Sequence, residues 1–370
     1  MRLRVRLAAL ACAACACFAL VTATFARNLP WVGVSPDGRG FVLLPSHQPF
    51  VPWGFNYDRD DAGRLLEDYW ERDWPRVASD FREMKALGAN VVRVHLQFGR
   101  FMDSPSRPNR RALAQLSRLV RLAERTGLYL DVTGLGCYHK ADVPGWYDAL
   151  DEAGRWAAQA AFWRAVAERC RRSPAVFCYD LMNEPVVPGE ERRAEWLGPA
   201  LAGKHYVQFI TRERRGRERT EIARAWVRHL VGAIRRVDAR HLITVGLVDW
   251  SLERPGRLFS GFAPERIAPE VDFLSVHLYP ESGALEASLE TLRGFAVGRP
   301  VLVEETFPLR CSLEEHARFL EASRAVAAGW LQFYWGRTPE EYRSGRTFPD
   351  AIMAGALEAF RTNAPAFRKP

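Results

Sequence analysis

The feature that most constrains the fold is a repeated alternation of short apolar runs and amphipathic segments along the 370 residues. Eight runs rich in β-branched and aromatic residues are separated by loops and by segments with helical periodicity. A strand followed by a helix and then another strand is typical of parallel pairing. The alternation therefore predicts a parallel sheet flanked by helices. It does not require a second domain, since one α/β barrel commonly takes up about 250 residues or more.

The elements expected from this pattern can be given as residue ranges. Strands are expected at 51–56, 90–95, 128–133, 175–182, 241–247, 271–277, 300–305 and 330–335, and helices at 74–87, 110–126, 156–171, 221–237, 285–295, 312–328 and 351–361. Residues 31–50 contain the turn sequence Pro36-Asp37-Gly38 and predict a β-hairpin before the first strand. An open, doubly wound sheet is the competing arrangement. We favour an α/β fold of the closed (β/α)8 TIM-barrel type, because the strand count is eight and polar residues gather just after the strands.

The N-terminus has the pattern of a secretory signal. Arg2, Arg4 and Arg6 precede an apolar stretch over 7–25, which ends in small residues around Ala26. Residues 1–26 are therefore expected to be a signal peptide and residues 27–370 one folded domain. The mature protein is expected to be secreted or periplasmic, monomeric, and without stable membrane insertion. Retention of the stretch as a membrane anchor is the alternative, because its length nearly reaches that of a spanning helix.

The charge and the motifs of the chain limit the kinds of partner and cofactor that it is expected to bind. The net charge of +8 comes almost entirely from dispersed Arg, and no nucleic-acid-binding motif is present, so no nucleic-acid partner is expected. Cofactors and metals are not expected, because the chain has neither a Gly-rich phosphate loop nor a paired-histidine motif. The cysteines beyond the signal are Cys137, Cys170, Cys178 and Cys311. They are interpreted as buried thiols or as containing one optional disulfide.

Two carboxylates follow apolar strands on opposite sides of the expected barrel. Glu184 ends the fourth strand and Glu305 ends the seventh. A carboxylate at the end of a buried run is costly unless it is exposed or used. Two acids across a barrel mouth suit glycoside hydrolysis, in which a protonated one donates to the leaving oxygen and an ionised one attacks the anomeric carbon. Each could instead be a structural ion pair with an Arg.

Several short motifs follow one another in a recognisable order. They are Phe50-Val51-Pro52-Trp53-Gly54-Phe55-Asn56, Gly88-Ala89-Asn90-Val91-Val92-Arg93, Asn183-Glu184-Pro185, His277-Leu278-Tyr279, Glu305 and Trp335. In this order they resemble the clan A glycoside hydrolases, most closely the cellulase and β-mannanase group of family 5. The resemblance covers nearly the whole mature chain, and Asn183-Glu184-Pro185 is its most specific part.

The resemblance implies a retaining hydrolase that cleaves β-glycosidic bonds in a mannan- or glucan-type oligo- or polysaccharide. It implies Glu184 as acid/base and Glu305 as nucleophile. The substrate-binding residues that it implies are Arg93 holding the nucleophile ionised, Asn183 on the sugar 2-hydroxyl, His277 and Tyr279 lining the subsite, Trp335 as an apolar platform, and His139 as the strand-three histidine. A barrel that binds carbohydrate without catalysis is the alternative, and the presence of both acids argues against it.

Some positions depart from the family pattern and leave choices open. Glu305 is followed by Thr306-Phe307-Pro308, where the family usually has an aromatic residue and Gly, so Glu304 remains an alternative nucleophile. His95 and Trp250 are further candidates for lining the subsite. The long segment 186–220 predicts either additional sugar subsites or a packed lid. The particular sugar, the choice between endo and exo action and the choice between hydrolysis and transglycosylation stay open.

Overall fold

The computed structural model describes residues 29–59 and 62–368, so the predicted signal peptide lies outside the described residues. Its centre is a closed barrel of parallel strands in the order β12-β13-β14-β15-β4-β5-β8-β9, which closes by pairing β9 with β12. This closure confirms the predicted (β/α)8 barrel over the open sheet. The barrel strands are β4 (Trp53–Tyr57), β5 (Val91–Gln97), β8 (Tyr129–Gly136), β9 (Val176–Asn183), β12 (Leu242–Val248), β13 (Leu274–His277), β14 (Val301–Thr306) and β15 (Ala327–Trp335).

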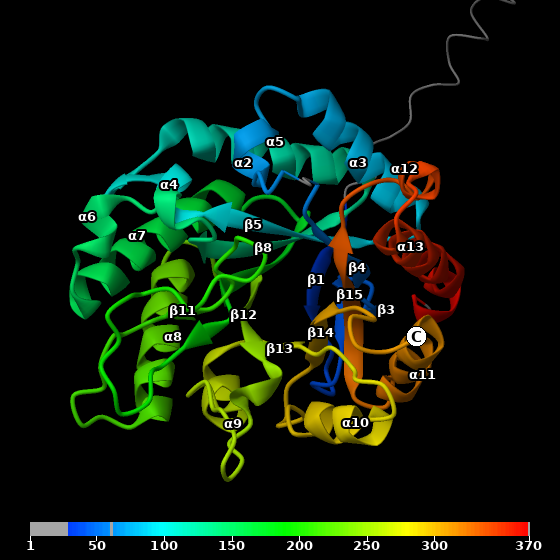
Figure 1. The fold of residues 1–370 in the computed structure, drawn as a ribbon. Helices are drawn as coiled ribbons and strands as arrows, with labels where there is room; N and C mark the ends of the chain where they lie inside the picture. The colour runs from blue at the N-terminus through cyan, green and yellow to red at the C-terminus, as the bar shows by residue number, and fades with distance from the viewer. Residues whose placement is uncertain (1–28, 60–61, 369–370) are drawn as a thin grey trace, which may run out of the picture.

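Helices surround the strands (Figure 1). The longer ones are α3 (Trp74–Ala86), α5 (Arg110–Thr126), α7 (Glu152–Cys170), α8 (Arg219–Arg235), α10 (Leu285–Arg293), α11 (Leu313–Ser323) and α13 (Phe348–Phe367). Short ones are α2 (Leu66–Tyr69), α4 (Phe98–Phe101), α6 (Gly145–Asp148), α9 (Pro264–Ile267) and α12 (Pro339–Ser344). No helix in the described part of the chain combines the length and the apolar character needed to cross a bilayer.

Local sequence signals explain where several helices begin and end. Helix α5 has the predicted bounds, because the Asn109 side chain accepts a hydrogen bond from the backbone at its start and Gly127 ends it with a φ of +71°. Helix α11 starts at the predicted Ser312/Glu315 capping box. Its predicted end at residue 328 was wrong, because Ala327 already pairs with Val301 in the barrel.

A small antiparallel sheet closes one end of the barrel. It consists of β1 (Trp31–Val34), β2 (Phe41–Leu44) and β3 (Gln48–Phe50), so the predicted hairpin is present with a third strand added. Phe41 packs edge-on against Phe177 and Phe273, with both pairs of ring centroids 5.1 Å apart. Phe177 and Phe273 lie at the N-terminal ends of β9 and β13. The sheet therefore plugs the end of the barrel opposite to the carboxyl ends of the strands.

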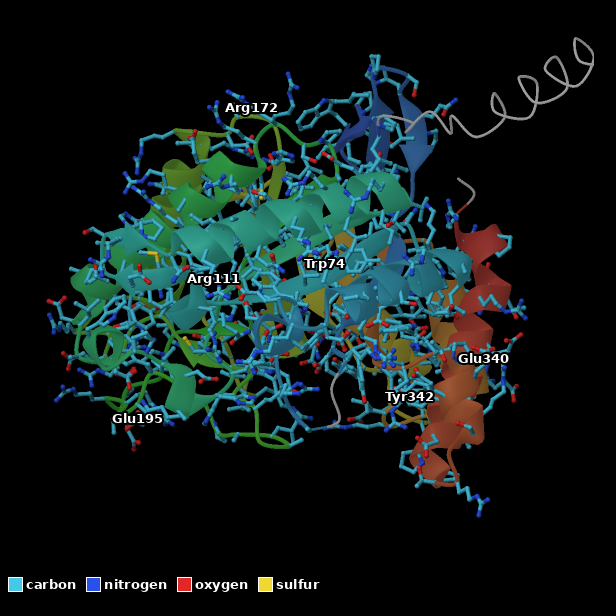
Figure 2. The ribbon with its side chains drawn as sticks, turned by 90° about the horizontal axis from the view of Figure 1, so that it is seen from above. Trp74, Arg111, Arg172, Glu195, Glu340 and Tyr342 are labelled. Atoms are coloured by element: carbon cyan, nitrogen blue, oxygen red, sulfur yellow. The ribbon has the colours of Figure 1, made fainter. Side chains whose placement is uncertain are left out.

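The structure bears on two expectations from the sequence, the dispersed basic charge and the state of the cysteines. Arg111 and Arg172 project from well-separated parts of the surface in Figure 2, as expected for dispersed basic charge. All four cysteines of the described chain are free thiols, three of them buried and Cys311 partly exposed. The optional disulfide is therefore absent among the described residues.

Close strand packing explains one motif glycine. A Cβ atom on Gly54 of β4 would lie 1.9 Å from the carbonyl oxygen of Val91 on β5. Only glycine permits this approach, and the register that it sets places Asn56 opposite Arg93 at the next layer of the barrel.

Candidate active site

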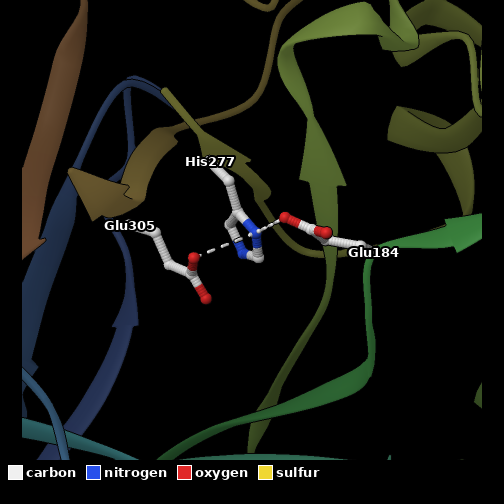
Figure 3. A group of neighbouring side chains, drawn as sticks. All are labelled: Glu184, His277 and Glu305. Carbon is white, nitrogen blue, oxygen red and sulfur yellow. Dashed lines mark hydrogen bonds and ion pairs between the residues drawn. The ribbon is translucent and has the colours of Figure 1, made fainter. Parts of the chain in front are cut away.

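Glu184 and Glu305 face each other at the carboxyl ends of β9 and β14. Glu184 follows β9 with a φ of +47°, and its N–H donates to the carbonyl oxygen of Gly246 on β12 (3.0 Å). One carboxylate oxygen from each glutamate and one ring nitrogen of His277 all lie within 4.8 Å of one another. Figure 3 shows the His277 ring between the two carboxylates. A separation near 5 Å suits direct attack by one carboxylate rather than attack by an interposed water.

Both oxygens of Glu305 are held by hydrogen-bond donors. Arg93 of β5 is fully buried, and its Nη1 donates to Oε1 of Glu305 (2.5 Å). The Tyr279 hydroxyl donates to Oε2 (2.6 Å). Charge-assisted bonds of this kind favour the ionised carboxylate and fix its direction. The arrangement fixes the direction of the Glu305 carboxylate at the edge of a cavity.

His277 connects Glu184 to the interior of the barrel. Its Nδ1 lies 3.0 Å from Oε1 of Glu184, and its Nε2 lies 3.2 Å from Oε2 of Glu304. Burial alone would lower the pKa of His277, but the charge of Glu305 and the hydrogen bonds to the other two glutamates raise it to about 10. A protonated His277 donates from both ring nitrogens, which holds the ring between the acids.

Glu304 and Glu305 both turn toward the barrel interior, although they are neighbours on one strand. Successive side chains of a regular strand alternate between faces. Here the register of β14 shifts against β13 and against β15 at this point, and such bulges re-aim side chains. Glu304 is fully buried and accepts a hydrogen bond from the Ser275 hydroxyl (2.9 Å), whereas Glu305 borders the cavity. Burial would raise the pKa of Glu304, but Arg93 and His277 lower it to about 2.

Asn183 precedes Glu184 and is almost fully buried. Its Oδ1 accepts a hydrogen bond from Arg93 (3.1 Å), and its Nδ2 donates to the carbonyl oxygen of Tyr206 (3.1 Å). Arg93 therefore contacts the residue next to Glu184 as well as Glu305 itself. This fixes the backbone that carries one acid relative to the carboxylate of the other.

A narrow cavity lies beside Glu305; water-sized spheres find about 30 Å³ of space in it, and the empty volume reaches about 470 Å³ only when open solvent at its mouth is counted. Its lining comprises Asn56, Tyr57, Asp58, Leu65, Leu66, His95, Gln97, Tyr138, Lys204, Tyr206, Glu305 and Phe333. His95, one of the further candidates from the sequence, is among these residues, whereas His139 is not. The residue before it, Tyr138, lines the cavity instead. Its hydroxyl lies 2.5 Å from Nδ1 of His95. Burial and the charge of Arg93 lower the pKa of His95 well below its usual range, so its ring is neutral.

The aromatic platform predicted at Trp335 is not part of the cavity lining. Trp335 is fully buried and packs beside Tyr57, with ring centroids 5.9 Å apart. Phe333 lines the cavity instead, with its ring centroid 6.2 Å from that of Tyr279. The two aromatics are two residues apart on β15, and sequence alone gave no signal to choose between them.

The long segment after β9 is partly packed and partly part of the cavity. It contains two short parallel strands, β10 (Pro185–Val186) and β11 (Gln208–Phe209). Trp196 is buried under the guanidinium groups of Arg155 and Arg212. Lys204 and Tyr206 line the cavity. One stretch of this segment is therefore packed against the barrel, and another lines the cavity.

Two groups of side chains have a spacing that would allow a metal cation to bind, but the positive charge of Arg93 beside both groups opposes its binding. Glu184, His277 and Glu305 form one group with metal-compatible spacing, and Asp131, Asp180 and Glu304 form another. The guanidinium of Arg93 lies 2.5 Å from Glu305 and 2.7 Å from Asp180, so a dication in either group would meet a fixed positive charge. The arrangement instead suits proton transfer and nucleophilic attack.

A parallel barrel with two facing carboxylates at the ends of its fourth and seventh strands defines a barrel glycosidase. The model of the family Cellulase (glycosyl hydrolase family 5) matches residues 54–305. The match spans more than half of the chain, and the chain belongs to glycosyl hydrolase family 5. Membership confirms the predicted class, an enzyme that hydrolyses O-glycosidic bonds.

Curated relatives and solved structures agree with this family. Mannan endo-1,4-beta-mannosidase A of Emericella nidulans is 24% identical over 292 residues, covering 71% of this chain and 68% of its own length. The enzyme of the same name from Aspergillus aculeatus is 23% identical, covering 80% and 79%. An exo-beta-1,4-mannosidase from an Opitutaceae bacterium superposes with a TM-score of 0.68 at 20% identity, covering 90% of this chain but 62% of its own. A likeness at this identity shows the fold alone.

Proposed function

We propose that the protein is a retaining β-glycosidase that uses Glu305 as nucleophile and Glu184 as acid/base on a β-1,4-linked, mannan-type substrate. The observation that carries the proposal is the spacing of the two carboxylates, with one oxygen of each lying within 4.8 Å of the other. Inverting enzymes hold their carboxyl groups about 6.5–9.5 Å apart to leave room for a water. The closer spacing supports direct attack.

The reaction proceeds by two displacements. Oε of Glu305 attacks the anomeric carbon, while protonated Glu184 gives its proton to the glycosidic oxygen that leaves. The product of this step is a glycosyl ester on Glu305 and a free aglycone. Glu184, now a carboxylate, takes a proton from a water that attacks the same carbon, and Glu305 leaves. Two inversions return the original anomeric configuration.

Neighbouring residues act on these two groups. Arg93 and Tyr279 hold Glu305 in the direction of attack through their hydrogen bonds to its two oxygens. His277 contacts Glu184 and holds its carboxylate toward the cavity. Asn183 is proposed to bond the sugar 2-hydroxyl. Phe333 takes the role of apolar platform that the sequence suggested for Trp335.

A mannose-type sugar is favoured over glucose. The curated relatives named above are both mannosidases, and so is the structural neighbour from the Opitutaceae bacterium. Their names include both endo and exo action, so they support the sugar and leave the site of cutting open. A carbohydrate-binding barrel without catalysis is disfavoured, because both acids are present and within reach of one bond.

Turnover of aryl β-mannosides and aryl β-glucosides tests the proposal. Wild type is expected to prefer the mannoside, and NMR of the first product is expected to show the retained anomer. Glu305→Ala is expected to abolish turnover, and azide is expected to restore part of it with inverted product, because a small anion can replace the missing nucleophile. An active Glu305→Ala beside an inactive Glu304→Ala would overturn the assignment.

Export as a single mature domain is a separate proposal. The basic residues before the apolar stretch support cleavage after Ala26 and release outside the cytoplasm as a monomer. N-terminal sequencing of the protein recovered from the periplasm or medium is expected to begin at Arg27. A full-length chain that remains in the membrane fraction would indicate the anchored alternative.

A further inference from the structure

The cavity beside Glu305 is walled by the segment that follows β9. Its lining includes Glu305 but not Glu184. In a retaining reaction the sugar that bonds to the nucleophile is the one on the non-reducing side of the cleaved bond, and the acid/base faces the leaving side. The cavity therefore lies on the side where the sugar that would be transferred to Glu305 has to bind.

One ion pair joins two residues of the cavity lining, Lys204 and Asp58. Nζ of Lys204 lies 2.6 Å from Oδ2 of Asp58, and the Lys204 side chain is only 9% exposed. Asp58 follows β4, and its N–H donates to the carbonyl oxygen of Trp335 at the end of β15 (3.1 Å). Lys204 belongs to the segment after β9, and β5 and β8 lie between β4 and β9 in the barrel. The pair therefore spans the mouth above these two strands.

The wall that carries Lys204 is held in place by hydrogen bonds. Leu201 and Lys204 exchange two backbone bonds of 2.9 and 3.0 Å around a tight turn in which Ala202 and Gly203 both have positive φ. The next residue, His205, donates its N–H to the carbonyl oxygen of Tyr138, which follows β8 (2.8 Å). These hydrogen bonds connect the turn that carries Lys204 to the segment that follows β8.

Aromatic rings continue the same wall around Glu305. The ring of Tyr206 lies 5.6 Å from that of Tyr138 and 6.4 Å from that of Phe333, and Phe333 lies 6.2 Å from Tyr279. These rings join the end of β8, the segment after β9, and the ends of β15 and β13. A polymer chain that passed through the cavity on the non-reducing side would have to displace this wall or the ion pair above it.

We propose that the enzyme acts from the non-reducing end and releases one sugar at a time, with Lys204 and Asp58 recognising the terminal unit. This inference rests on the proposed function. In a β-1,4-linked chain the 4-hydroxyl is free only on the non-reducing terminal sugar. An ammonium donor and a carboxylate acceptor side by side can bond that hydroxyl as acceptor and as donor. Interior units, whose O4 carries another sugar, do not fit.

Defined oligosaccharides test the inference with the full-length wild-type enzyme. The substrates are β-1,4-mannopentaose, the same chain with its terminal 4-hydroxyl methylated, and polymeric mannan. Wild type is expected to release mannose as the only early product, to leave the viscosity of the polymer unchanged and to cleave the methylated chain about 100-fold more slowly. Early di- and trisaccharides with a rapid fall in viscosity, or equal rates on the two pentasaccharides, would overturn the inference.

Two variants test whether Lys204 and Asp58 cause the preference for a free 4-hydroxyl. The double variant Lys204→Ala/Asp58→Ala removes both charges together, so no unpaired charge is left in the wall. Its preference for the free-ended pentasaccharide is expected to fall at least about tenfold, with oligosaccharides appearing among the products. Lys140→Ala is the matched control, because Lys140 also holds this segment through Glu195 (2.9 Å) but lies outside the cavity. It is expected to keep the wild-type product pattern.

Failure of the inference can be distinguished from failure of the proposed function. Thermal unfolding shows whether the double variant folds. If the double variant does not fold, the product pattern of the wild type still tests the inference. A folded double variant with unchanged selectivity would remove the role of the ion pair. If wild type turns over no aryl glycoside at all, the proposed function fails instead.

Discussion

Two groups of carboxylates lie around Arg93, one formed by Glu184 and Glu305 and the other by Asp180 and Glu304. The two groups differ in their access to the cavity. Glu184 and Glu305 keep 17% and 6% of their side chains exposed, whereas the side chains of Asp180 and Glu304 are completely buried. The same guanidinium contacts Glu305, Asp180 and Glu304 at 2.5, 2.7 and 3.4 Å. One cation thus stabilises a buried group that holds the barrel together and orients a group that can reach a substrate.

Asp131 shows how the buried group differs in kind. Asp131 is fully buried, and its polar neighbours in the described part of the chain are the Glu304 carboxylate and the Cys178 thiol rather than a cation bonded to its oxygens. Burial and the charge of Glu304 raise its pKa well above the usual range, so it carries a proton in the folded state. A position at a strand end therefore does not distinguish a reactive acid from a structural one. The hydrogen-bond partners of the acid and its access to the cavity distinguish them.

The largest expected effect separates the two neighbouring glutamates. Glu305→Gln keeps the size of the side chain but removes the attacking charge, so kcat/KM is expected to fall on the order of 10⁴-fold or more with a small change in stability. Glu304→Gln is the matched control at the adjacent position. It is expected to retain measurable turnover and to lose more stability, as measured by urea unfolding. Reversal of this pattern would place the reactive acid in the buried group.

Removal of the shared cation is expected to destabilise both groups. Arg93→Ala leaves buried carboxylates without their counter-charge, and breaking such pairs costs about 3–5 kcal/mol. The free energy of unfolding is expected to fall by at least this amount, with loss of activity in parallel. Arg111→Ala, at an exposed surface pair with Glu71, is expected to leave stability nearly unchanged. Wild-type stability of Arg93→Ala would contradict the account.

The pH dependence tests the imidazole that bridges the groups. The pKa of His277 is raised to about 10, above the model-compound value of 6.5. A protonated partner of this kind contributes stability that is fully present below pH 6.5 and is lost as the pH rises toward 10. Wild type minus His277→Asn is therefore expected to show a stability difference that declines across this range in urea unfolding. A difference that grows with pH would mean that the ring is neutral when folded.

The smallest expected effect concerns Asp131. Asn has the shape of a protonated Asp, so Asp131→Asn is expected to be at least as stable as wild type at pH 7 in urea unfolding. Its gain in stability over wild type is expected to increase from pH 4 upward, because the unfolded wild type loses its proton there while the folded protein keeps it. A marked loss of stability at pH 7 would show that Asp131 is ionised and paired.

The fold was predictable because its signals are local. Helix α5 has a capping Asn109 and a terminal Gly127, and the periodic runs between such signals give the strand count. The positions of Glu184 and Glu305 follow from that count, since parallel strands bring their carboxyl ends to one face.

The details of the site depend on contacts between distant segments. The bulges beside β14 turn Glu304 and Glu305 the same way, and nothing in residues 301–306 encodes them without β13 and β15. Burial of Trp335 and exposure of Phe333 to the cavity depend on how β15 packs against β4. The pair of Lys204 and Asp58 joins residues 146 positions apart, which sequence patterns within one segment cannot reveal.

The most direct test of the central claim is to trap the glycosyl–enzyme intermediate. A 2-deoxy-2-fluoro mannosyl fluoride slows the second displacement, so the sugar is expected to remain bonded to the protein after the first. Fragmentation of the labelled peptide that contains residues 301–306 then distinguishes the two adjacent glutamates. We expect the added mass on Glu305 and none on Glu304. A label on Glu304, or full turnover with no trapped sugar in an otherwise active enzyme, would contradict the account.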